Sequence, residues 1–288
     1  KCTVPLELGT AESGEGVDGD WPYWWECPGA EGVAAEAAIA DATGNNITGK
    51  VTADNRTNQV IDPVIIWHGY KCSALDLHNE ARRAEVEAKV RRELDAILPG
   101  AIERELESGR VARLAGFANP YLRDLSTVNQ IPPANGALGF VSALGELEQA
   151  LATNGVAAGR RIIHAQPRLV NLWASRDLVE VSPDRTHLLT KLGTYVVPGT
   201  GYTGSAPGTA TNVAGTYAFS WAYATGMVHV LLDQPMAREL ELNQASITSR
   251  DVNDAELRIE QGAAIVWDTC PHYGLRVALC DEFCGSGS

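Results

Sequence analysis

The chain has 288 residues, of which 45% are hydrophobic and 20% charged, a balance typical of a soluble globular protein with a sizeable core. No apolar run approaches the roughly 18 to 20 residues that a membrane span needs, so no membrane association is expected. The formal net charge of −13 argues against nucleic-acid binding as the main task, because phosphate contacts need an excess of Lys and Arg. The first residues lack the basic-then-apolar pattern of a signal peptide, so export by the usual route is not expected.

The cysteines leave the redox state open. An even count is compatible with disulfides, but a chain of this size does not need them to be stable. We expect reduced, mostly buried thiols, and the alternative is one or more disulfides, chiefly among the terminal cysteines. The six residues are Cys2, Cys27, Cys72, Cys270, Cys280 and Cys284.

Residues 1 to about 62 differ in composition from the rest of the chain. They are rich in Gly, Ala, Asp, Asn and Thr, and no helical or alternating period lasts long enough to build a core. Within them lies one aromatic run, Trp21-Pro22-Tyr23-Trp24-Trp25. Its large apolar surface should not stay in water. The run therefore forms either a local core or a docking element for the rest of the chain or a neighbouring subunit.

The strongest helix signal extends from about Ala74 to Gly109. At about 1.5 Å per residue such a helix reaches roughly 50 Å and must lie across the molecule. Pro99-Gly100 should kink it or split it into two collinear pieces, and Gly109 stands where a C-terminal cap belongs. The Glu and Arg residues between the apolar positions predict a solvated, ion-paired outer face. One apolar stripe recurs at spacings of four, four, three and four: Val86, Val90, Leu94, Ile97 and Ala101.

The remaining segments predict strands and two shorter helices without a regular βαβ repeat, which indicates an α+β fold. Ser142 is the expected N-cap of one helix that closes at Gly155, and Pro167 opens another that runs to about Asp177. Residues 199–211 predict a loop that contributes no side chains to a hydrophobic core. Strands are expected at 63–69 (with His68 as an ordinary strand residue), 161–165, 194–197, 228–232, 255–259, 263–267 and 275–279.

Motifs for catalysis or cofactor binding are absent. The sequence has no phosphate-binding GxxxxGK[ST] or GxGxxG before a helix, no HExxH and no GxSxG. The sharpest candidate is Cys270 with His272, followed by Cys280 and Cys284, but this spacing is poor for zinc. We therefore expect structural residues there, and no metal or cofactor. A cysteine- or metal-dependent enzyme using Cys270, His272 and Cys280 is the least favoured alternative.

The order of these segments resembles the major capsid protein of tailed bacteriophages, the Hong Kong 97-type fold that encapsulins share. In that family a loose arm and an extended loop precede a long spine helix and a mixed axial domain. Residues 161–167 resemble the family's strand-to-helix entry into the axial domain, and residues 192–199 resemble its LG-x-PVV stretch. Residues 221–226, 228–232 and 264–268 resemble the late strands of capsid proteins from phages of actinobacteria. The usual Pro of the family's LG-x-PVV stretch is Tyr195 here.

The resemblance implies a division of the chain into five parts. These are an N-terminal arm (1–35), an extended loop (36–62), a peripheral domain with the spine helix (63–118), an axial domain (119–240) and returning strands with a tail (241–288). The aromatic run has no general counterpart in the family. From its large apolar surface we expect inter-subunit contacts at Trp21, Tyr23, Trp24 and Trp25. Lys50, in the presumed loop, is the only well-placed candidate for a covalent cross-link, which the scarcity of Lys makes less expected.

The implied function is structural. Many copies would assemble as hexamers and pentamers into an icosahedral shell around double-stranded DNA, in the host cytoplasm, and become part of the virion. Portal, scaffold and decoration proteins are the further partners that the resemblance suggests. The alternative with the same fold is an encapsulin-like compartment that holds a protein cargo.

Overall fold

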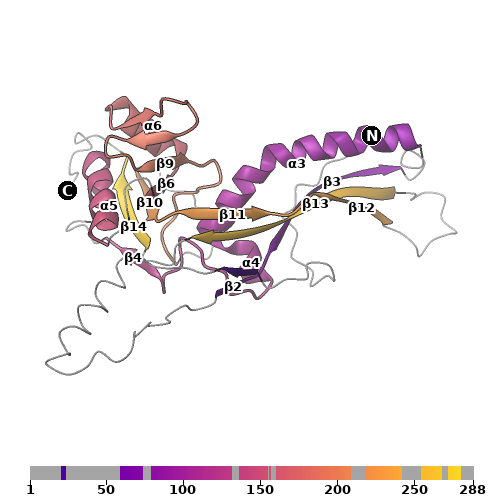
Figure 1. Cartoon of the computed structure of the whole chain (residues 1–288), viewed down its shortest axis with the longest axis horizontal. Coiled ribbons are helices and arrows are strands. Elements are labelled where there is room, and N and C mark those ends of the chain that lie inside the picture. Colours follow the sequence, from indigo (N-terminus) through magenta and orange to yellow (C-terminus); the bar gives the residue numbers. More distant parts are fainter. Residues whose placement is uncertain are drawn as a thin grey trace, which may run out of the picture.

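Helices and strands alternate irregularly along the chain, which confirms the predicted α+β class. The computed structural model describes residues 21–23, 59–73, 79–131, 136–154, 156, 160–208, 218–241, 254–267 and 272–279. Within these residues the molecule is elongated, with a two-layer arm on one side and a more compact body on the other (Figure 1). None of the described helices is long and apolar enough to cross a membrane.

This two-layer arm is distinct from the predicted N-terminal arm at residues 1–35. It consists of one long helix, α3 (Glu80–Ser108), packed on a four-stranded antiparallel sheet. The central strand of the sheet pairs with one strand along one edge and with two successive strands along the other. These strands are β13 (Asp254–Trp267) in the centre, β3 (Val64–Ser73) on one side, and β11 (Val228–Leu232) and β12 (Met236–Glu241) on the other.

Local signals set both ends of α3. The side chain of Asn79 caps the first turn by accepting hydrogen bonds from backbone N–H groups. Gly109 ends the helix in the left-handed conformation with φ 57°, and a Cβ there would lie 2.6 Å from the Tyr121 ring. Between these caps, Val90 and Leu94 are fully buried against the sheet, where they share a core with Leu257 and other sheet residues.

The body is an eight-stranded sheet covered on one face by α5 (Phe140–Thr153) and α6 (Pro167–Ser175). Its strand order is β4-β14-β10-β6-β9-β8-β7, and β5 also pairs with β14. The strands are β4 (Val128–Gln130), β5 (Leu138–Gly139), β6 (Ile162–Ala165), β7 (Val179–Val181), β8 (Leu188–Thr190), β9 (Tyr195–Pro198), β10 (Phe219–Thr225) and β14 (His272–Ala278).

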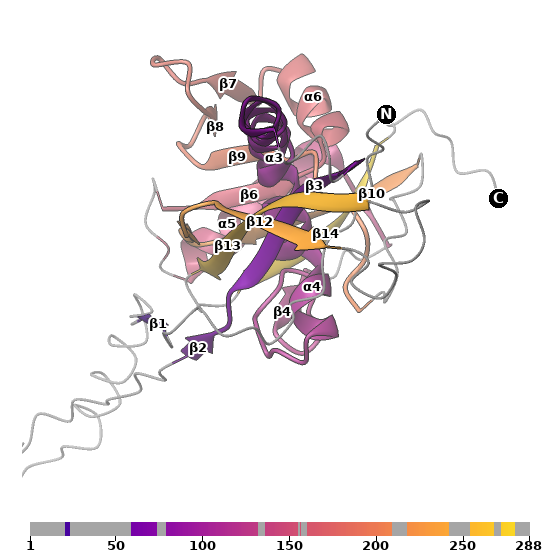
Figure 2. The same cartoon turned by 90° about the vertical axis from the view of Figure 1, so that its right-hand side faces the viewer.

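Two smaller elements complete the described fold. The short helix α4 (Arg110–Leu114) follows α3 directly after Gly109. Strand β1 (Trp21–Tyr23) pairs antiparallel with β2 (Gln59–Ile61), which immediately precedes β3. Figure 2 shows this pair at the edge of the molecule, away from α5 and α6.

Most of the predicted elements are present, with shifted ends. Helix α3 begins at Glu80 rather than near Ala74, and residues 74–78 lie outside the described part. Pro99 does not split it, and one helix runs through this position. The two strands expected at 255–259 and 263–267 are a single strand, β13, because its pairing with β3 continues through Gly262 to Ala263, where the pairing with β11 begins.

Two local predictions are wrong. Ser142 is not a cap, because α5 begins at Phe140 with Gly139 in the N-cap position and no side-chain cap. Residues 199–206 do make core contacts: Gly199, Tyr202 and Ser205 are buried. The closure at Gly155 lies outside the described residues, although the helix ends at Thr153, beside it.

The predicted domain boundaries remain a prediction. Strands β11 and β12 pair with β13 in the sheet of the arm, whereas β14 belongs to the sheet of the body. The chain therefore passes between the two sheets several times after residue 225.

Candidate functional site

The described residues bring polar side chains together where the C-terminal end of α3 meets the body. We call residues 199–206, which follow β9, the junction loop. Glu103 accepts a hydrogen bond from Gly201 N at 2.9 Å. Glu107, one turn later, accepts from Thr203 N and Oγ1 at 2.8 Å each and from Gly204 N at 3.0 Å. Two carboxylates on one face of α3 thus hold the backbone of the junction loop.

Glycines allow this loop to touch the helix backbone. A Cβ at Gly201 would lie 2.3 Å from the carbonyl oxygen of Gly100 and 2.7 Å from Arg104 N, closer than real Cβ atoms come. Gly100 in turn lies under Thr200, whose hydroxyl would be 3.2 Å from a Cβ there. The Pro99-Gly100 step therefore serves as a contact surface for the junction loop.

The other side of the junction loop is bound to the body. Tyr202 Oη lies 2.8 Å from His164 Nδ1, and His164 Nε2 lies 2.9 Å from Thr225 Oγ1. Trp221 N donates to the carbonyl oxygen of Gly204 at 2.9 Å, and Tyr223 Oη donates to that of Ser205 at 2.6 Å. The loop is thus the hydrogen-bonded link between α3 and strands β6 and β10.

A third carboxylate, Glu105, points away from the junction loop and caps α4. It accepts from Val111 N at 2.8 Å and from Ala112 N at 2.9 Å. Burial raises the pKa of Glu103, Glu105 and Glu107. The hydrogen bonds that each carboxylate accepts from backbone N–H groups oppose this rise. The prediction of a solvated, ion-paired face on α3 is therefore wrong at Glu105, which is buried.

Replacing Glu105 by Ala should destabilise α4 without disturbing the junction loop. Two buried N–H groups would lose their acceptor, and we expect a loss of about 2 kcal/mol in the free energy of unfolding. Urea denaturation followed by circular dichroism measures this loss. Amide exchange should accelerate at Val111 and Ala112 and not at Gly201 or Thr203; acceleration at all four would contradict the separation of the two sites.

A second polar cluster lies between the sheet of the arm and α3. His68 Nε2 is 2.9 Å from a carboxylate oxygen of Glu93, which also accepts from the hydroxyl of Tyr70. The Tyr70 hydrogen bond lowers the pKa of Glu93, and burial raises that of Tyr70. His68 lies in β3, as predicted, and its imidazole is satisfied by a carboxylate of α3. The cluster connects α3 to β3 through hydrogen bonds.

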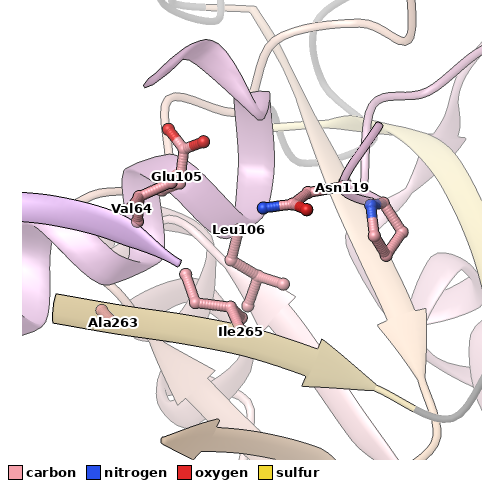
Figure 3. Close-up of a pocket in the computed structure, with 7 residues that line it drawn as sticks. Val64, Glu105, Leu106, Asn119, Ala263 and Ile265 are labelled. Carbon is pink, nitrogen blue, oxygen red and sulfur yellow. The ribbon is translucent and has the colours of Figure 1, made fainter. Parts of the chain in front are cut away.

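Figure 3 shows a small pocket between the arm sheet and the end of α3. Its volume of about 10 Å³ has room for roughly one water molecule, far below the several hundred Å³ of a ligand site. Asn119 at its wall is held by the backbone of Asp62, with N–O distances of 3.0 and 2.7 Å. The lining residues are Val64, Glu105, Leu106, Asn119, Pro120, Ala263 and Ile265.

The outer surface of the described part carries two unusual features. From Asn79 to Lys89 every side chain is exposed except Val86 and Glu87, which are half-buried. Large apolar side chains are also exposed at well-separated places on the chain: Leu114 (65%), Leu125 (59%), Val141 (51%), Val181 (58%), Leu192 (64%), Val230 (41%), Leu232 (45%) and Met236 (47%). Single apolar side chains are common on protein surfaces, so the exposed part of α3 is the more informative of the two features.

The structure reaches only part of the predicted site. Trp21 and Tyr23 lie in β1, whose backbone pairs with β2 of the same chain. Trp24, Trp25 and Lys50 lie outside the described residues, as do Cys270 and Cys280. His272 is 4% exposed and its ring lies edge-on to Trp267 at 5.7 Å. Within the described residues no group of three or more His, Cys, Asp or Glu side chains could hold a metal ion.

No family model and no curated protein sequence matches the chain. The chain resembles several solved structures at low sequence identity. The holo-SrpI encapsulin complex of Synechococcus elongatus has 12% identity and a TM-score of 0.45 over 78% of this chain and 77% of that one. The structure of Gordonia phage Cozz has 13% identity and a TM-score of 0.47, and the match covers 81% of this chain and 78% of that one. The head structure of Helicobacter pylori bacteriophage KHP40 has 11% identity and a TM-score of 0.45, and the match covers 83% of this chain and 82% of that one. These are the two groups, phage heads and encapsulins, that the sequence resemblance named.

Proposed function

We propose that the chain is the major capsid subunit of a tailed-phage-type icosahedral shell, assembling as hexamers and pentamers. The observation that carries this proposal is the exposed first part of α3, residues 79–89. Helices in proteins gain most of their stability from tertiary packing, and this stretch has little packing within the described chain. A neighbouring subunit that covers it would supply the missing contacts.

Separate exposed apolar side chains support the same proposal. Val181 and Leu192 lie at the β7 end of the body sheet, whereas Val230, Leu232 and Met236 lie along β11 and β12 of the arm. Contacts between two different surfaces of identical chains generate rings when the rotation closes. A subunit with apolar side chains on both the arm and the body is suited to such head-to-tail contacts.

The charge is compatible with a container for DNA. A wall with a net charge of −13 repels a polyanion and avoids tight nonspecific binding to it. We include double-stranded DNA as the content on this ground, and we propose no enzymatic activity. The boundaries at residues 35, 62, 118 and 240, the contacts of Trp21, Tyr23, Trp24 and Trp25, and a role for Lys50 belong to the same proposal.

Sizing of the purified full-length chain tests the proposal. Electron microscopy and analytical ultracentrifugation should show closed particles, and a stable monomer at high concentration would contradict the proposal. Extraction of the particles decides their content, because DNA supports the capsid and a protein cargo the encapsulin-like alternative. If no closed particles form and the chain binds stoichiometric zinc and shows catalysis that depends on Cys270, an enzyme would be favoured.

A pair of surface variants tests the apolar contacts. Leu192→Asp should leave the subunit folded and reduce the yield of particles at least tenfold, because a charge would replace an exposed apolar side chain at the presumed contact. Ala152→Asp, at an exposed position of α5, is the matched control and should assemble normally. Equal particle yields for the two variants would remove Leu192 from the interface.

A further inference from the structure

Two histidines lie buried on the face of the body sheet that receives the junction loop. His164 comes from β6 and is 3% exposed, and His272 comes from β14 and is 4% exposed. β10 lies between these strands and is paired with both. Neither residue belongs to a motif, and the proposed shell function does not require either.

Hydrogen bonds hold the imidazole of His164 in its neutral form. Thr225 Oγ1 donates to the carbonyl oxygen of Gly226 at 2.8 Å, so it accepts the proton of His164 Nε2. The lone pair of Nδ1 is then left to accept from the hydroxyl of Tyr202, in the junction loop. A proton on Nδ1 would end this Tyr202 hydrogen bond and leave a buried positive charge.

His272 adds a second group with the same sensitivity. Its Nε2 is buried and has no hydrogen-bond partner among the described residues. The imidazole is close enough for a positive charge on it to disfavour a charge on His164. Protonating both would place two like charges in one apolar layer, next to the Trp267 ring.

We propose that His164 and His272 form an acid-sensitive release that separates the junction loop from the body sheet when both are protonated. The contacts that would open are those of Tyr202 with His164 and of the neighbouring loop backbone with β10. The contacts of the same loop with Glu103 and Glu107 are not made through either histidine. A protonated carboxyl group can still accept from a backbone N–H through its carbonyl oxygen, so in acid the loop would keep its contacts with α3 and leave the sheet.

Nearby charged groups do not stabilise the protonated histidines enough to keep the junction closed. Burial lowers the pKa of His164 from 6.5 to about 3 and also lowers that of His272, which a backbone hydrogen bond with Leu122 and the charge of Asp124 oppose. The carboxylates on the α3 side, Glu103 and Glu107, have raised pKa values and lose their charge as the pH falls. The remaining ionisable groups that face the junction are Arg123, which adds positive charge, and the phenols Tyr202 and Tyr223, whose pKa values burial raises.

The direction of the pH effect follows from these shifts. Both histidines have a lower pKa in the closed state than in an open, solvated state, so the open state binds more protons. The closed state is fully favoured above about pH 6.5 and loses this advantage as the pH falls toward 3. For His164 alone, linkage allows the opening equilibrium to rise by up to about 50-fold between pH 6.5 and 4.5.

Backbone hydrogen–deuterium exchange on the full-length chain tests the release. After correction for intrinsic rates, the amide of Trp221, which donates to Gly204 of the junction loop, should lose protection at least tenfold between pH 7.5 and 4.5, reversibly. The amides of Gly201 and Thr203, which donate to α3, and those of α5 should stay protected. In the H164Q/H272Q double variant the loss should be less than threefold. The control variant His187→Gln changes a half-buried histidine beyond β7 and should behave like the unmodified chain.

Three results would overturn the proposal. They are unchanged protection of the Trp221 amide in the unmodified chain, the same loss in the double variant, and loss of protection in α5 at the same pH. If the double variant does not fold, exchange of the histidine C2 protons in the unmodified chain decides. A midpoint for His164 below pH 5 supports the release, and a midpoint near 6.5 removes it.

Discussion

Val90→Asp should unfold the arm and lower the free energy of unfolding by more than about 4 kcal/mol. Val90 is 0% exposed and shares its core with Leu94 of α3 and with Leu257 and Ile259 of β13. An aspartate there would be a buried charge with no cationic partner in that core. Urea denaturation followed by circular dichroism, together with the soluble yield, measures the loss.

Ala96→Asp is the matched control for this experiment. Ala96 lies in the same helix at an exposed position, so the change should cost only the difference in helix propensity, about 0.5 kcal/mol. Similar losses for the two variants would mean that the buried face of α3 is wrongly assigned.

Glu107→Ala should be the most damaging change at the junction. The carboxylate accepts three hydrogen bonds, from Thr203 N, Thr203 Oγ1 and Gly204 N, and the variant leaves these donors without their acceptor in a buried place. We expect a loss of roughly 3 to 5 kcal/mol in the free energy of unfolding. Exchange of the amide protons of Thr203 and Gly204 should also accelerate at least tenfold.

Glu85→Ala provides the control for Glu107→Ala. Glu85 is exposed on the same helix and forms a surface pair with Arg82 at 2.8 Å, which contributes well under 1 kcal/mol. An effect of Glu107→Ala as small as that of Glu85→Ala would contradict the role of Glu107 in holding the junction loop.

The sequence predicted the elements whose signals lie within a few residues of each other. The apolar stripe of α3, the glycine at its C-terminal end and the proline that opens α6 each act on the adjacent turn of the chain. The strands β6, β9 and β11 were found for the same reason, since short β-branched runs are bounded by turn residues. Short strands such as β7, at the edge of the body sheet, and β8, beside it, carry too few residues for such a pattern and were not predicted.

The junction was not predicted, although its residues carry a signal. Glu103 and Glu107 are four residues apart, on the same face of α3 as Gly100, and Gly199, Gly201 and Gly204 follow a strand. A carboxylate pair beside a helical glycine and a glycine-rich loop are each common. The partners are 98 residues apart for Glu103 and Gly201 and 97 for Glu107 and Gly204, and no local pattern relates such distant positions.

The sequence alone therefore determined that the chain contains a long helix capped by Gly109 and that the fold is α+β, because amphipathic period and caps are local properties. Only the tertiary structure decided which charges of that helix face water. Glu85 remains on the surface, whereas Glu107 is buried because the junction loop supplies the N–H groups that compensate its carboxylate. A charged residue reads the same in sequence at both positions, and the difference comes from the partners that folding brings to it.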